Sequence, residues 1–227
     1  MKRICVRWIA PAVLLLVLTM TVYGGGWASV TVKNLPEYFV AGKQATLTFV
    51  VRQHGISLTD RLPVTLIASA AGGPEAKAVI TPTGKGEYTA ALILPRAGNW
   101  TIRIHIGLWE SYPPYTLLPM QAIAADSPAP QALSEVAKGE RLFVAKGCNG
   151  CHVNKEVAAE NLVSVGPDLT GKKFPLDYLR KFLADPAGTK GKAPSPSYGE
   201  MPNLDLEKDE IAALAAFINR ERPIARR

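Results

Sequence analysis

The sequence Cys-Asn-Gly-Cys-His at residues 148–152 restricts what this chain can fold into more than any other feature. Two thiols three positions apart can add across the two vinyl groups of a haem, and the adjacent His152 is then placed to ligate the iron. The motif therefore predicts one covalently bound haem c, held by Cys148, Cys151 and His152. A disulfide or a redox dithiol is the remaining alternative.

Two other uses of a Cys-x-x-Cys pair lack the partners they need. A structural zinc site requires two further Cys or His ligands, and a thioredoxin-like motif requires a βαβ setting. The other cysteine is Cys5 in a hydrophobic leader, the other histidines, His54 and His105, lie far upstream, and no βαβ pattern surrounds the motif.

Residues 1–28 have the pattern of a signal peptide or an N-terminal membrane anchor. A basic start is followed by a predominantly apolar run of sixteen residues at 8–23 and then by small residues. This apolar run is short for a membrane span and suits a secretory leader, cut after Ala28. Retention as an anchor through residues 4–23 is the alternative, because counting from Ile4 brings this stretch close to spanning length. In both cases we expect export to the periplasm or to the outer face of the cytoplasmic membrane.

The formal charge of +7 does not indicate a nucleic-acid partner. Three of the basic residues lie in the leader, residues 29–133 carry eight basic and six acidic residues, and residues 134–227 carry fifteen and thirteen. No basic stripe is interleaved with aromatic residues. We therefore expect no binding to nucleic acid.

Residues 29–110 alternate between apolar and polar positions, as half-buried strands do. Segments 46–52, 87–94 and 99–106 each place their apolar residues on one face. Glycine and proline punctuate the region every eight to twelve residues. We predict six or seven short strands in an antiparallel, immunoglobulin-like sandwich.

Residues 111–133 are rich in proline and form the predicted linker. Its last ten residues, if extended at about 3.1 Å per residue, would hold the flanking domains roughly 30 Å apart and give the second domain reach. The first part, residues 112–120, is apolar enough to lie on the sandwich.

Residues 134–227 have the period of helices. Ser134 can cap a helix that runs to about residue 146, with Val136, Gly139, Leu142 and Phe143 facing inward. Residues 176–184 predict a second helix and residues 205–222 a third. Gly139 has no side chain to obstruct a close crossing of two helices.

This region resembles the class I c-type cytochromes. The shared features occur in the family's order and are Gly139-x-x-Leu142-Phe143, the motif at 148–152, Gly166-Pro167-Asp168-Leu169, Tyr178-Leu179, Asp185-Pro186, Met201-Pro202 and a final helix with Ile211, Leu214 and Phe217. The resemblance implies an all-α cytochrome c domain and attachment of the haem outside the cytoplasmic membrane.

A second axial ligand is expected, because an open iron position would bind water or oxygen. Met201 lies 49 residues past His152, and a thioether there would favour Fe(II). The resemblance implies that the Pro167 carbonyl accepts a hydrogen bond from the other ring nitrogen of His152. Tyr178, Tyr198 and Asn203 are weaker candidates for hydrogen bonds to a propionate or to the methionine sulfur.

The β region resembles periplasmic immunoglobulin-like modules of the YtkA-like or FixH-like type, on Gly86-Glu87-Tyr88 and the segment 94–100. Such relatives are associated with copper handling or oxidase assembly. Cysteine-dependent copper centres are excluded, since residues 29–147 contain no cysteine. His54, His105 and Met120 offer at most a loose metal site.

No catalytic set stands out, so we expect an electron carrier and not an enzyme. Its partners would be redox proteins, in particular a membrane respiratory complex, and the sandwich would serve as a docking module. Lys146, Lys172, Lys173, Lys190 and Lys192 are predicted to surround the haem opening and to steer an acidic partner. A haem enzyme or gas sensor with a labile methionine, and an assembly or copper-handling factor, are the alternatives.

Overall fold

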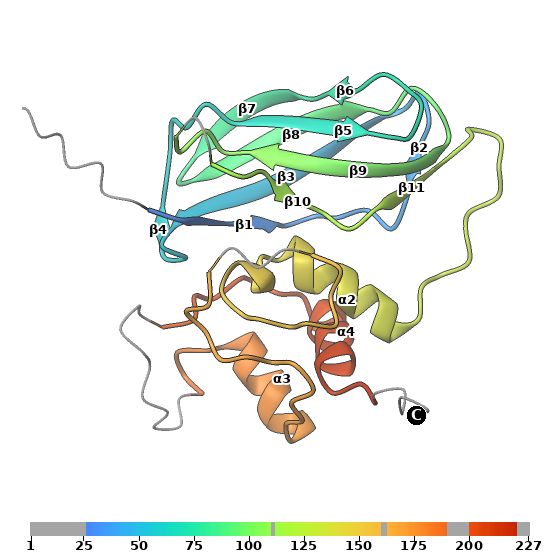
Figure 1. Cartoon of the computed structure of the whole chain (residues 1–227). Helices are drawn as coiled ribbons and strands as arrows, with labels where there is room; N and C mark the ends of the chain where they lie inside the picture. Colours follow the sequence, from blue (N-terminus) through green and yellow to red (C-terminus); the bar gives the residue numbers. More distant parts are fainter. Residues whose placement is uncertain (1–25, 110–111, 160–162, 190–199, 222–227) are drawn as a thin grey trace, which may run out of the picture.

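The computed structural model describes residues 26–109, 112–159, 163–189 and 200–221. Within these residues a β-sandwich is followed by helices that pack beneath it (Figure 1). The predicted fold class, an all-β sandwich followed by an all-α domain, is confirmed. Most of the predicted leader lies outside the described residues. Among the described residues, no helix has the length and apolar character needed to cross a bilayer.

Two sheets make the sandwich. The first has the order β1 (Ala28–Val32), β3 (Gln44–Gln53), β8 (Glu87–Ile93) and β7 (Val79–Gly84), with β4 (Ser57–Leu58) paired to β3. The second has the order β2 (Phe39–Val40), β11 (Met120–Ile123), β9 (Gly98–His105), β5 (Thr65–Ser69) and β6 (Ala76–Lys77), with β10 (Tyr115–Thr116) paired to β9. All pairs are antiparallel except β2 with β11.

The alternating patterns predicted from the sequence place the expected side chains in the core. Tyr88 and Leu92 of β8, and Trp100 and Ile104 of β9, are at most 1% exposed. Segments 46–52, 87–94 and 99–106 coincide with β3, β8 and β9 within a residue or two of each end. The period of two is therefore confirmed for these three strands.

Strand β1 lies at an edge of its sheet, yet all five of its residues are buried. Val30 and Val32 belong to the sandwich core, whereas the polar residues Ser29 and Thr31 alternate with them. A methyl group added at Gly150 of the helical region would lie 3.6 Å from Cβ of Ser29. The outward face of β1 is thus covered by the haem-motif region.

Three α-helices and one short turn follow in the described residues. They are α2 (Glu135–Ala145), the 3-10 turn η1 (Cys148–Gly150), α3 (Leu176–Ala184) and α4 (Lys208–Ile218). Ser134 caps α2 as predicted, by accepting a hydrogen bond from the Ala137 amide. At α4, Glu207 and Glu210 form a reciprocal capping box. Val136 was predicted to face inward but is 37% exposed.

Helices α2 and α4 cross at Gly139. A Cβ atom on this residue would lie 2.0 Å from the carbonyl oxygen of Ala213 and 2.6 Å from Cβ of Phe217. Phe143 packs one turn further on, with its ring centroid 5.5 Å from that of Phe217. The close crossing predicted at Gly139 is confirmed.

The connection between the two regions is shorter than the predicted linker. Strands β10 and β11 fall within residues 111–133 and pair with β9, so the sandwich extends to Ile123. Prolines 113, 114 and 119 lie beside these strands and keep them short, because proline cannot donate to a ladder. The helices pack directly on the sandwich instead of hanging from an extended tether (Figure 1). The predicted cut after Ala28 would fall inside β1.

Candidate functional site

The Cys-Asn-Gly-Cys-His motif forms a tight turn at the end of α2. Lys146 caps the helix, and Gly147 then takes a left-handed backbone with φ of 84°. The amides of Cys151 and His152 both donate to the carbonyl of Cys148, at 3.1 and 2.8 Å. Burial raises the pKa of Cys148, and the turn places Cys151 close enough to raise it further.

The His152 ring is fixed by the segment that contains Gly166 and Pro167. Its Nδ1 lies 3.0 Å from the Pro167 carbonyl oxygen, the contact that the resemblance implied. A Cβ on Gly166 would lie 2.5 Å from ring atom Cε1, so only glycine fits beside the ring. With Nδ1 protonated and donating to Pro167, Nε2 is the nitrogen that would bind an iron. Burial lowers the pKa of His152, which favours the neutral, ligating imidazole.

The two motif thiols are poor thiolates. Burial raises the pKa of Cys148 to about 12 and that of Cys151 to about 11, and both cysteines are free. A structural zinc site needs four Cys or His ligands, and among the described residues no group of three or more His, Cys, Asp or Glu side chains could hold a metal ion. Two thiols beside an oriented imidazole are the groups that hold a covalent haem.

Met201 lies in the extended segment that leads to α4. Its side chain is partly buried and packs against the hydrophobic core. Tyr178 is 42% exposed on α3 and stacks on Phe182. Asn203 accepts a hydrogen bond from the Asp205 amide at 2.9 Å, which is a local turn contact. Tyr198 lies outside the described residues.

Met120 and His54, two of the residues considered for a loose copper site, lie in different environments. Met120 is fully buried in the sandwich core, and His54 is exposed in the turn after β3. Within the described parts of the chain, no group of three or more His, Cys, Asp or Glu side chains could hold a metal ion.

The prediction that Lys146 belongs to an exposed ring of lysines is wrong, and the ammonium group of Lys173 is engaged by backbone carbonyls. Lys146 is only 2% exposed and pairs with Glu210 at 2.6 Å. Lys173 donates to the carbonyls of Asn219 and Arg220 at the end of α4. Lys172 is exposed, whereas Lys190 and Lys192 lie outside the described residues. A long-range ion pair leaves no local pattern in the sequence, so the burial of Lys146 was not predictable.

Sequence reasoning also missed Tyr115 and Asn149. The Tyr115 hydroxyl of β10 lies 2.5 Å from both the Val144 carbonyl oxygen and Asn149 Oδ1. Tyr115 was assigned to the region around the linker, and Asn149 is one of the two variable positions of the motif. Nothing in the sequence links these two residues.

The sandwich is similar in fold to several solved structures at low identity. They include the Lin-41 filamin domain (14% identity, 42% of this chain and 91% of that one, TM-score 0.34) and the Escherichia coli adhesin FdeC (18%, 44% and 31%, 0.35). Domains 4 and 5 of the S-layer protein SbsC are also similar (16%, 44% and 46%, 0.31). No curated protein matches the chain.

The helical region matches a known family. The cytochrome c family model covers residues 136–220, which include all of α2 except its first residue, the motif turn, α3, Met201 and α4. This match agrees with the donor set and with the fixed orientation of His152, and it supports a protein that binds haem and transfers electrons. Residues 136–220 form a cytochrome c domain that follows an immunoglobulin-like β-sandwich.

Proposed function

We propose that this protein is an exported electron carrier with a single haem, acting in a respiratory chain. The observation that carries the proposal is the motif turn, in which the buried Cys148 and the partly buried Cys151 accompany an oriented imidazole inside a cytochrome c domain. The sequence contains one Cys-x-x-Cys-His motif, which supports one haem.

The residues of the site have distinct roles in this proposal. A bound haem would supply an iron that alternates between the ferric and ferrous states. Cys148 and Cys151 would hold the haem through thioethers, and the Pro167 carbonyl would orient the His152 ring for the iron. Met201 would be the second iron ligand, and its thioether would favour the ferrous state. The buried side chains of α2 and α4 keep water from the interior of the site.

The location and the partners are part of the same proposal. The apolar leader at residues 8–23 supports export, and residues 4–23 would tether the chain if they were retained. The partners would be redox proteins at the outer face of the membrane, in particular a respiratory complex. Purification from native membranes with the associated subunits identified would test this, and recovery of the protein in the cytoplasm would contradict it.

Absorption spectra test the axial ligands. The ferric protein should show the long-wavelength charge-transfer band of a methionine–iron bond, and the ferrous protein should bind carbon monoxide slowly or not at all. Met201→Leu should lose the band and bind carbon monoxide readily. Met120→Leu is the matched control, because it makes the same change of side chain in the sandwich core and should leave the spectrum unchanged.

Two outcomes would favour other functions. Rapid carbon monoxide binding to the native ferrous protein would indicate a five-coordinate haem, as in a gas sensor or haem enzyme. Copper binding tighter than micromolar by the full-length protein would indicate an assembly or copper-handling factor.

A further inference from the structure

Tyr115 of the sandwich reaches into the turn that carries the haem-binding motif. It is 4% exposed, and its hydroxyl contacts two residues of the helical domain. The Val144 carbonyl belongs to the last turn of α2, and Asn149 lies between the two motif cysteines. One side chain of β10 therefore contacts the turn on both sides of Cys148.

The two contacts have a defined polarity. The Val144 carbonyl oxygen and Asn149 Oδ1 are both acceptors, so the Tyr115 hydroxyl is the donor in both contacts. Its single proton is shared between the two oxygens, as in a three-centre hydrogen bond. Tyr115 thus donates both to α2 and to the motif.

Lys146 makes a second connection between the sandwich and the same turn. Its Nζ donates to the Lys33 carbonyl just after β1, at 2.9 Å, and forms the ion pair with Glu210 of α4. Gly147 lies so close to β1 that a Cβ there would be 2.6 Å from the Val30 carbonyl oxygen. The sandwich therefore holds the turn at residues 144–150 by side chains and by close backbone packing.

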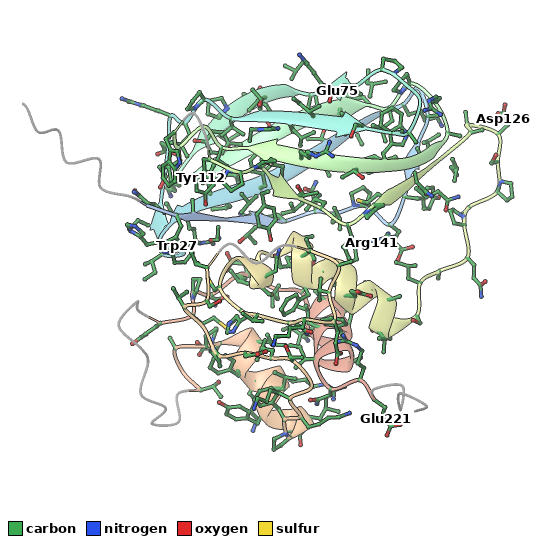
Figure 2. The ribbon with its side chains drawn as sticks, in the orientation of Figure 1. Trp27, Glu75, Tyr112, Asp126, Arg141 and Glu221 are labelled. Carbon is green, nitrogen blue, oxygen red and sulfur yellow. The ribbon has the colours of Figure 1, made fainter. Side chains whose placement is uncertain are left out.

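The side of the turn that faces Cys151 is also covered. A Cβ on Gly55, in the turn after β3, would lie 2.9 Å from the Trp27 ring and 3.6 Å from Cys151 Sγ. Figure 2 shows Trp27 at the end of the sandwich that faces the helical domain. The Cys151 sulfur accordingly lies against the sandwich, which screens it in part from solvent.

We propose that the sandwich is a structural part of the haem site and that Tyr115 is a positioning residue for the Cys148–Cys151 turn. The inference rests on the proposed haem function and deepens it. Screening by the sandwich disfavours the more highly charged ferric state and raises the reduction potential. We call the contacts of Tyr115 with Val144 and Asn149 the clamp. A cavity of about 350 Å³, lined in part by Tyr115, Asn149 and Ala158, lies beside the clamp and gives water a route to a loosened turn.

Tyr115→Phe in the full-length holoprotein tests the positioning role. It removes the hydroxyl and keeps the ring. Tyr112→Phe is the matched control, because the Tyr112 hydroxyl hydrogen-bonds with the backbone amide and carbonyl of Ala28, within the sandwich. We expect a lower midpoint potential for Tyr115→Phe and an unchanged potential for Tyr112→Phe. Equal potentials for the wild type and Tyr115→Phe would overturn the proposal.

A double-mutant cycle with Asn149→Ala tests the contact itself. A buried hydrogen bond changes an unfolding equilibrium constant by about fivefold, and the two substitutions should be non-additive by about this factor. Far-ultraviolet circular dichroism reports the unfolding through the backbone. Additive effects would refute the clamp. A wild-type protein without haem would instead refute the proposed function, and with it the positioning role.

Discussion

Replacement of Gly139 by alanine should destabilise the protein, although alanine is the better helix former. The added Cβ would lie 2.0 Å from the Ala213 carbonyl oxygen, whereas ordinary contacts begin near 3.4 Å. The two helices would have to separate by more than 1 Å, because neither contacted atom can rotate away. Overpacking costs about 1–3 kcal/mol, and the upper end applies to a backbone clash. Alanine recovers about 1 kcal/mol of helix propensity, which leaves a net loss of about 2 kcal/mol.

Urea unfolding of Gly139→Ala, followed by far-ultraviolet circular dichroism, measures this loss of free energy. In thermal unfolding, the melting temperature should fall by about 4–8 °C, on the scale expected for a chain of this length. Glu140→Ala, at the next position of α2, is the control and should remain within about 0.5 kcal/mol of the wild type. A Gly139→Ala protein that is as stable as the wild type, or more stable, would show that α2 and α4 do not cross as closely as described.

Two further predictions concern charged side chains that hold the helices. Lys146→Met leaves the largely buried Glu210 without its ion-pair partner and should lower the free energy of unfolding in urea by about 3–5 kcal/mol. Adding Glu210→Gln should recover most of that loss. No recovery in the double variant would contradict the ion pair. Lys138 lowers the pKa of Asp209 through a hydrogen bond. The ionised carboxylate therefore stabilises the fold at pH values above its unfolded pKa of about 3.9. This stabilisation is lost as the pH falls through the lower pKa of Asp209 in the folded state. Asp209→Asn should therefore cost less than about 1 kcal/mol at neutral pH and nothing in strong acid, as unfolding measured across pH would show.

The local elements were predictable because their patterns are short-range. A period of two located β3, β8 and β9, and Ser134 located the start of α2. The motif itself identified the two thiols and the imidazole of the candidate site. Each of these signals lies within one segment of the chain.

The packing between the two regions was not predictable, because it depends on pairs far apart in the sequence. Tyr115 and Asn149 are separated by 34 positions and Lys146 and Lys33 by 113. The prediction that residues 112–120 lie on the sandwich is confirmed by β10 and the start of β11. The predicted separation of the two domains by the last ten linker residues is wrong, because the helices pack directly on the sandwich through contacts that leave no local pattern in the sequence.

The mass of the intact, unfolded protein tests the central claim most directly. If Cys148 and Cys151 hold one haem covalently, the polypeptide should keep the mass of one haem after denaturation and extraction with acidic organic solvent, and the variant with both cysteines changed to serine should keep none. The same mass would show whether the leader is removed. A wild-type mass equal to the polypeptide alone, or increased by two haems, would contradict the account.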